Sequence, residues 1–159
     1  MTTVIDGLVP GTLVLIATSF LLSSVTGIGL YQHCVVIPAW FREPPASFAS
    51  INQYGKSEVR FWVPLQAITM IALVVSLLMH WREPARRALI VAACACYLVV
   101  AAVTAVYFAP RIIAWSKMNP DGAASRELRA ASHRWVLWSW IRQGILVVGD
   151  LLLLRALAM

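Results

Sequence analysis

Residues 88–110 read ALIVAACACYLVVAAVTAVYFAP and contain no charged side chain. About 20 predominantly apolar residues are enough for a helix to cross the roughly 30 Å hydrocarbon core of a bilayer. Three further segments are long and predominantly apolar, which gives predicted spans at about 8–38, 61–80, 88–110 and 135–159. We therefore predict an all-α integral membrane protein, folded over residues 1–159 as a single four-transmembrane-helix domain and arranged as an up-down-up-down four-helix bundle.

The composition of the chain agrees with a membrane protein. Of its 159 residues, 60% are hydrophobic and 13% are charged, and the mean hydropathy is +0.77. The formal net charge is +6, but no zinc-ligand spacing, basic stripe or aromatic RNA-binding motif accompanies it, so we expect no nucleic acid partner. The expected partner is the lipid bilayer. The expected location is a multi-pass position in a membrane, which in a bacterium is the inner membrane.

The N-terminal sequence bears on processing. MTTVIDGLVPG lacks the basic region of a signal peptide, and the apolar run that follows is too long for a signal-peptide core. We expect the first helix to remain in the mature protein.

The connections predict which ends of the spans share a side of the membrane. The short segment HWREPARR, residues 80–87, makes the second and third spans antiparallel neighbours. The two longer connections, at about 41–60 and 111–134, then lie on one face, here called the long-loop face, and both termini lie on the other. The longer connections hold more basic residues, which under the positive-inside rule favours a cytoplasmic long-loop face, whereas the three arginines packed into the short connection count against it.

Polar residues within the spans recur at helical spacing. Lipid tails cannot form hydrogen bonds, so such residues should face other helices. Each span has one polar stripe, made of Ser19, Ser23, Thr26 and His33; Trp62, Gln66, Thr69, Ser76 and His80; Tyr97, Thr104, Tyr107 and Arg111; and Trp135, Trp138, Arg142 and Gly149. Ser19, Ser23 and Gly27 also form a small-xxx-small pattern, which is typical of close helix contacts.

Four of these polar residues are predicted to lie at similar depth below the long-loop face: His33, Gln66, Tyr107 and Arg142. We predict that they line one pocket and that Trp40, Trp62 and Trp135 surround its mouth. Ligand binding is assigned to Gln66 and to these three tryptophans. Catalytic roles, if the protein is an enzyme, are assigned to His33, Arg142 and Tyr107.

Each ionisable group also has a structural interpretation. Arg142 within a span suggests a functional site, but its side chain is long enough to reach the headgroups instead. His33 fits a base or ligand, and equally a hydrogen-bonded interfacial histidine. Asp150 should reach a basic group such as Arg82 or Arg86, or be protonated. Cys34, Cys94 and Cys96 are interpreted as packing residues, and no metal site is expected.

Several segments together resemble a bacterial branch of the anthrone-oxygenase-like membrane domain family of unknown function. They are GIGLYQHCVVIPAW at 27–40, PPASF at 44–48, FWVP at 61–64, VYFAP at 106–110, and Arg134-Trp135 with Arg142. The resemblance covers nearly the whole chain and implies four membrane helices. Some fungal members of this family are linked to the oxidation of an anthrone to an anthraquinone by molecular oxygen.

Two functional hypotheses follow. In the first, the protein is a non-catalytic or accessory membrane protein whose polar pocket binds a small hydrophobic or quinone-like molecule. In the second, which the resemblance implies, it is a cofactor-independent oxygenase acting on an anthrone-like aromatic substrate, with His33 as the base and Arg142 or Tyr107 stabilising the oxyanion. No nicotinamide, flavin or phosphate-binding motif is present. The cofactor is therefore unknown: the site is either free of a cofactor or binds haem through one histidine. A homo-oligomer is a further possible partner.

Overall fold

Four long helices make up the fold in a computed structural model of the chain, which describes residues 10–123 and 125–159, apart from the side chains of 52–56. The first comprises α1 (Pro10–Tyr31), the π-helix η2 (Gln32–Val36) and α2 (Ile37–Trp40). The second is α3 (Ala49–Met79), preceded by the short 3₁₀ helix η3 (Ala46–Phe48). The third comprises α4 (Pro84–Val103), the π-helix η4 (Thr104–Phe108) and α5 (Ala109–Ser116), and the fourth is α6 (Arg126–Leu157).

The four helices are long and apolar enough to cross a membrane, over Pro10–Trp40, Ser57–Met79, Pro84–Ser116 and Arg126–Leu157. No strand occurs within the described residues. The predicted all-α membrane fold is therefore confirmed, and the protein is a multi-pass membrane protein. The start of the first predicted span, at residue 8, lies outside the described part.

One predicted loop is largely helical. The segment 41–60 was expected to connect two spans, but α3 already begins at Ala49, directly after η3. The last prolines before it are Pro44 and Pro45, so no residue downstream of them interrupts the backbone hydrogen bonds until Pro64. The polar residues of this segment extend α3 beyond its apolar part instead of forming a loop.

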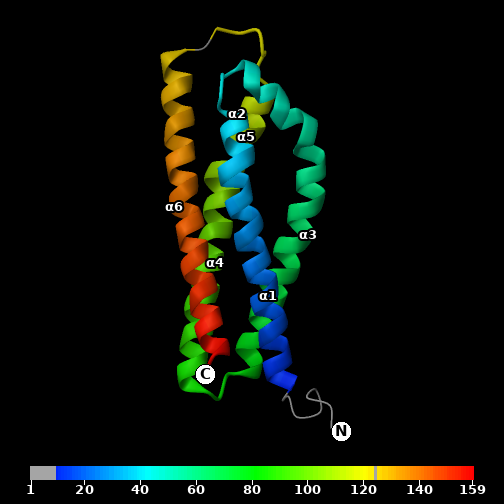
Figure 1. Cartoon of the computed structure of the whole chain (residues 1–159), viewed down its shortest axis with the longest axis vertical. Coiled ribbons are helices and arrows are strands. Elements are labelled where there is room, and N and C mark those ends of the chain that lie inside the picture. The colour runs from blue at the N-terminus through cyan, green and yellow to red at the C-terminus, as the bar shows by residue number, and fades with distance from the viewer. Residues whose placement is uncertain (1–9, 124) are drawn as a thin grey trace.

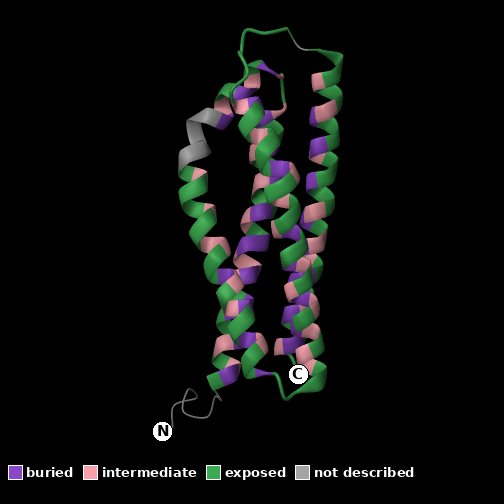
Figure 2. Cartoon of the chain, turned by 180° about the vertical axis from the view of Figure 1, so that it is seen from behind, coloured by how far each residue is buried: buried purple, intermediate pink, exposed green. Residues whose placement is uncertain are grey.

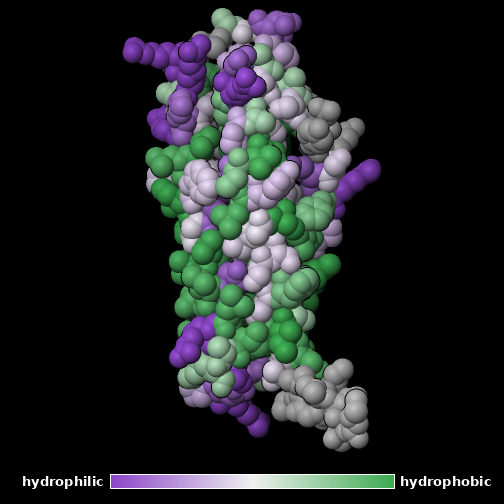
Figure 3. Space-filling view, viewed as in Figure 1, coloured by the Kyte–Doolittle hydropathy of each residue, from purple (hydrophilic) through white to green (hydrophobic). Residues whose placement is uncertain are grey.

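The helices pack as an antiparallel bundle (Figure 1). α1 contacts both α3 and α6, and α4 contacts both α6 and α3. The two longer connections meet at one end of the bundle, while the start of α1, the short connection and the C-terminus meet at the other. Buried residues line the inward sides of the helices in Figure 2, and Figure 3 shows hydrophobic side chains along the middle of one face with hydrophilic ones at both ends.

The core has two parts. An aliphatic cluster, which includes Leu22, Leu73, Ile90 and Leu153, fills the bundle toward the short connection. An aromatic cluster lies near the long-loop face and contains Trp40, Phe48, Phe108, Trp115 and Trp135, with Phe41 and Tyr107 packed against it. The aromatic cluster holds together residues of all four long helices near the long-loop face.

Two of the helices contain π-helical turns, and both turns lie just before a proline. The N–H of Ile37 bonds to the carbonyl of Gln32, and the N–H of Ala109 bonds to the carbonyl of Thr104. Pro38 and Pro110 follow directly. A proline lacks the N–H that an α-helix needs and its ring crowds the preceding turn, and a local π-turn relieves this conflict without breaking the helix. π-Turns are frequent at functional sites, so both segments are candidates.

Candidate functional site

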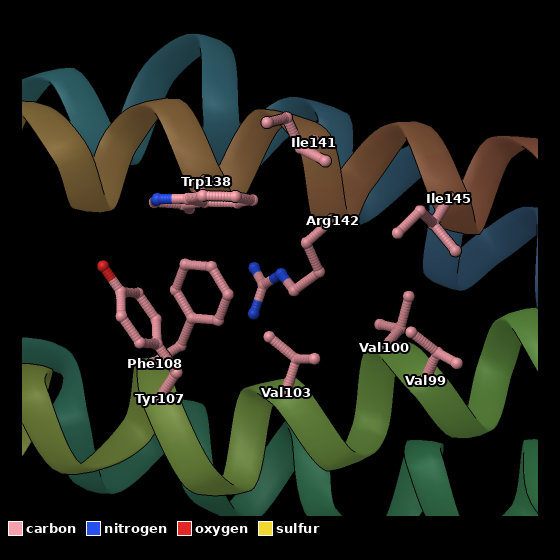
Figure 4. A pocket seen from close by; sticks show the side chains of 9 residues that line it. All are labelled: Val99, Val100, Val103, Tyr107, Phe108, Trp138, Ile141, Arg142 and Ile145. Carbon is pink, nitrogen blue, oxygen red and sulfur yellow. The ribbon is translucent and has the colours of Figure 1, made fainter.

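A pocket of about 400 Å³ lies between the third and fourth long helices (Figure 4). Three valines of α4 form one side, and residues of α6 form the other. Tyr107 and Phe108 of η4 close the pocket toward the long-loop face. Apart from Arg142 and the hydroxyl of Tyr107, the side chains that line it are apolar or aromatic.

Arg142 is the charged group of this pocket. Its Nη1 donates to Thr104 Oγ1 at 3.0 Å, and its guanidinium carbon lies 4.4 Å from the centre of the Phe108 ring. The Thr104 hydroxyl in turn donates to the carbonyl of Val100 at 2.6 Å. In the part of the chain that the structure describes, no carboxylate lies within 4.0 Å of this guanidinium. A guanidinium has five N–H donors, so the arginine can also bind a ligand oxygen.

The π-turn holds the residues that contact the arginine. Thr104 begins η4 and Phe108 ends it, so the hydrogen-bond acceptor and the aromatic face come from one five-residue segment. Tyr107 lies between them, with its ring against Phe108 at 4.9 Å between centres. The guanidinium of Arg111 lies 3.8 Å from the centre of the Tyr107 ring. Tyr107 therefore connects the pocket with Arg111 in the first turn of α5.

Of the four residues predicted to share a pocket, Tyr107 and Arg142 do so, whereas His33 and Gln66 make their contacts elsewhere. The ring of His33 packs against Trp140 at 4.9 Å between centres. Trp140 and Arg142 are two positions apart on α6, which is about 200° around a helix, so they face different neighbours. The side-chain oxygen of Gln66 accepts a hydrogen bond from the hydroxyl of Tyr97. The functional roles assigned to His33 and Gln66 remain predictions.

The imidazole of His33 is held in one tautomer. Its Nδ1 lies 2.7 Å from the carbonyl oxygen of Gly29, which can only accept, so Nδ1 carries the proton. Nε2 is therefore an acceptor, and it is buried with no hydrogen-bond partner among the described residues. An unprotonated Nε2 is able to accept a proton, as a base must, but His33 does not line the pocket that contains Arg142.

The tryptophans are distributed differently from the prediction. Trp40 and Trp135 belong to the aromatic cluster, and Trp62 packs against the aliphatic one. Trp138 is the tryptophan that lines the pocket, and its ring lies across from Phe108 (Figure 4). Its position in the same polar stripe as Arg142, four residues away, was the sequence signal that could have assigned it to the site.

The expected pairing of Asp150 with Arg82 or Arg86 is not formed. Ser23 Oγ donates to Asp150 Oδ1 at 2.8 Å, which joins α1 to α6. Arg86 instead pairs with Glu83, one turn away, and donates through Nε to the carbonyl of Ala156 at 3.1 Å. Asp150 is buried within the bundle, where Ser23 of the neighbouring helix is within hydrogen-bond distance, whereas the side chain of Arg86 is occupied by Glu83 and the carbonyl of Ala156.

Comparison with known proteins bears on the pocket. The family model described as anthrone oxygenase matches residues 54–152, which is more than half of the chain and includes every residue that lines the pocket. His33 and Trp40 precede the matched region. Comparisons with curated proteins and with solved structures gave no match. The chain belongs to the anthrone oxygenase family.

Proposed function

We propose that the pocket between α4 and α6 binds a flat, apolar aromatic molecule that carries a carbonyl or phenolic oxygen, with that oxygen facing Arg142. One observation carries the proposal: a guanidinium lies in an otherwise apolar pocket, bonded to one threonine and without a carboxylate among the described residues. A charge within a membrane span is costly unless it serves a partner. A ligand oxygen is the partner that this pocket can accommodate.

The size and shape of the pocket support an aromatic ligand. Its volume of about 400 Å³ lies within the usual range of roughly 300–1,000 Å³ for small-molecule sites. The rings of Trp138 and Phe108 lie on opposite sides of the pocket (Figure 4), and the guanidinium of Arg142 covers one face of Phe108. Aromatic pairs favour offset stacking or edge contacts, which a fused-ring ketone or quinone can make with both.

The test compares two ligands of one shape, 9,10-anthraquinone and anthracene, because only the first carries oxygen. Kd values would be measured in nanodiscs by quenching of tryptophan fluorescence, for the wild type and for Arg142→Gln. A hydrogen bond to a charged group contributes about 1.5–3 kcal/mol, so the wild type should favour anthraquinone by roughly tenfold to 150-fold more than the variant does.

Arg155→Gln is the matched control, because Arg155 is an exposed arginine of the same helix and does not line the pocket. It should behave like the wild type. Equal discrimination by the wild type and Arg142→Gln would refute the proposed contact.

A second candidate function is oxygenation of an anthrone, which the description of the matching family favours. Loss of the proton opposite the carbonyl leaves an enolate whose oxygen would be held by Arg142. The carbanion carbon then bonds to O₂, and after protonation the hydroperoxide loses water to form the second carbonyl. Anthrone and O₂ thus become anthraquinone and H₂O. The pocket lining contains no carboxylate or histidine, so the proton acceptor must lie outside the lining, which is the role predicted for His33 from the sequence.

Oxygen uptake tests this second function. Wild-type protein in nanodiscs should consume one O₂ for each anthrone, above the spontaneous rate. Loss of an oxyanion-stabilising donor typically lowers kcat by about 10²–10³, so Arg142→Gln should approach the spontaneous rate. Uptake no faster than in protein-free nanodiscs would leave binding without catalysis.

A further inference from the structure

The mouth of the pocket lies on the outer side of the bundle. Val99, Val103, Trp138 and Ile141 line it, and these side chains are between 40% and 52% exposed. Val100 and Phe108, which also line it, are buried. All of these residues lie within the helices that cross the membrane. The exposed side of the pocket therefore faces lipid.

The pocket is closed in the other directions. Toward the long-loop face, the Phe108 ring meets the Trp135 ring at 5.2 Å between centres, and this contact joins η4 to α6 within the aromatic cluster. Toward the short connection, a Cβ at Gly149 would lie only 3.0 Å from the Cβ of Cys96, so α4 and α6 touch there. A molecule coming from the water would have to separate one of these contacts.

We propose that the ligand enters sideways from the bilayer, through the gap between Val103 of α4 and Ile141 of α6. This inference rests on the proposed function. It restricts the ligand class to molecules that dissolve in the hydrocarbon region without charge, because a charged group is expelled from it. Arg142 lies at the depth of the hydrocarbon region from which the ligand enters, and it binds the carbonyl oxygen once the ligand is inside the pocket.

The first test narrows the gap. Val103→Phe adds bulk at the mouth without adding a fluorophore, and Val91→Phe is the control, because Val91 is an equally exposed valine of α4 outside the pocket. Anthraquinone binding in nanodiscs would be followed by stopped-flow quenching. A narrowed route lowers the association and dissociation rates together, by about tenfold, while Kd changes by less than about threefold. Val91→Phe should leave both rates unchanged.

The second test needs no variant and therefore applies even if Val103→Phe does not fold. It uses 2-methyl-, 2-ethyl- and 2-pentylanthraquinone, which differ in membrane partitioning. Entry from the bilayer predicts that the association rate per aqueous concentration rises in proportion to the partition coefficient. Entry from water predicts that it does not.

Lateral entry would be refuted if the association rate depended neither on the partition coefficient nor on the size of the side chain at residue 103. Binding that depends on Arg142, and with it the proposed function, would be unaffected by that result. Anthraquinone binding that is equally tight in Arg142→Gln would overturn the proposed function, and with it the inference that rests on it, because the pocket would then not recognise the ligand oxygen.

Discussion

Replacing Arg142 with leucine should make the empty protein more stable while abolishing its preference for ligands that carry oxygen. The guanidinium is half-buried among apolar side chains, and no carboxylate of the described residues offsets its desolvation. The variant loses the hydrogen bond to Thr104, but that hydroxyl keeps its bond to the carbonyl of Val100, so no polar group is left unpaired. On insertion scales an arginine at the centre of a membrane helix costs about 2.5–3.5 kcal/mol, whereas a leucine is slightly favourable. We expect a gain of about 1–2 kcal/mol after the contacts of the arginine are subtracted.

The measurement is equilibrium unfolding by SDS in mixed micelles, with helicity followed by circular dichroism. Arg155→Leu, at an exposed position of the same helix, should change the free energy of unfolding by no more than about 0.5 kcal/mol. Anthraquinone at 100 times the wild-type Kd should raise the stability of the wild type by about 2.7 kcal/mol, and that of Arg142→Leu by no more than about 1.4 kcal/mol because its Kd is at least roughly tenfold higher. A clear loss of stability in Arg142→Leu would mean that the arginine serves the packing of α4 against α6 and not a ligand.

Two glycines of α1 should respond to alanine with opposite signs. An alanine in a helix interior is favoured over glycine by about 1 kcal/mol. At Gly27 a Cβ would meet no atom within 4 Å, so Gly27→Ala should stabilise the protein. At Gly29 a Cβ would lie 2.5 Å from Oε1 of Gln143, whose Nε2 donates to the carbonyl of Thr26 at 3.0 Å. Gly29→Ala must displace this amide, which should cost about 1–3 kcal/mol.

The same unfolding assay checks this pair, and a double variant isolates the cause. If the Gln143 side chain is the obstacle, adding Gln143→Ala to Gly29→Ala should recover most of the lost stability. A double variant as unstable as the sum of the two single ones would place the conflict elsewhere. The small-xxx-small prediction is therefore wrong at Gly27, which is exposed, although Ser19 is buried and Ser23 contacts Asp150 of α6.

The sequence predicted the architecture because a membrane imposes its requirement locally. Each span needs a long apolar run, and that property can be read from consecutive residues without knowing any neighbour. The run at 88–110 and the short connection at 80–87 therefore determine a helix pair on their own. The polar stripe of the fourth span also placed Trp138 and Arg142 on one side of α6, and both line the pocket.

The partners of those side chains could not be predicted, because helical spacing defines a face but not the helix that it meets. Tertiary packing turned Arg142 toward Thr104 of η4 and left His33 against Trp140, so two residues expected together face different helices. The π-turns before Pro38 and Pro110 add to this, since each interrupts the 3.6-residue period from which the polar stripes were assigned to one helix face. The membrane-spanning fold followed from the residues in order along the chain, while the pocket depended on which helix faces met and on where the proline-linked turns changed the rotation of the side chains.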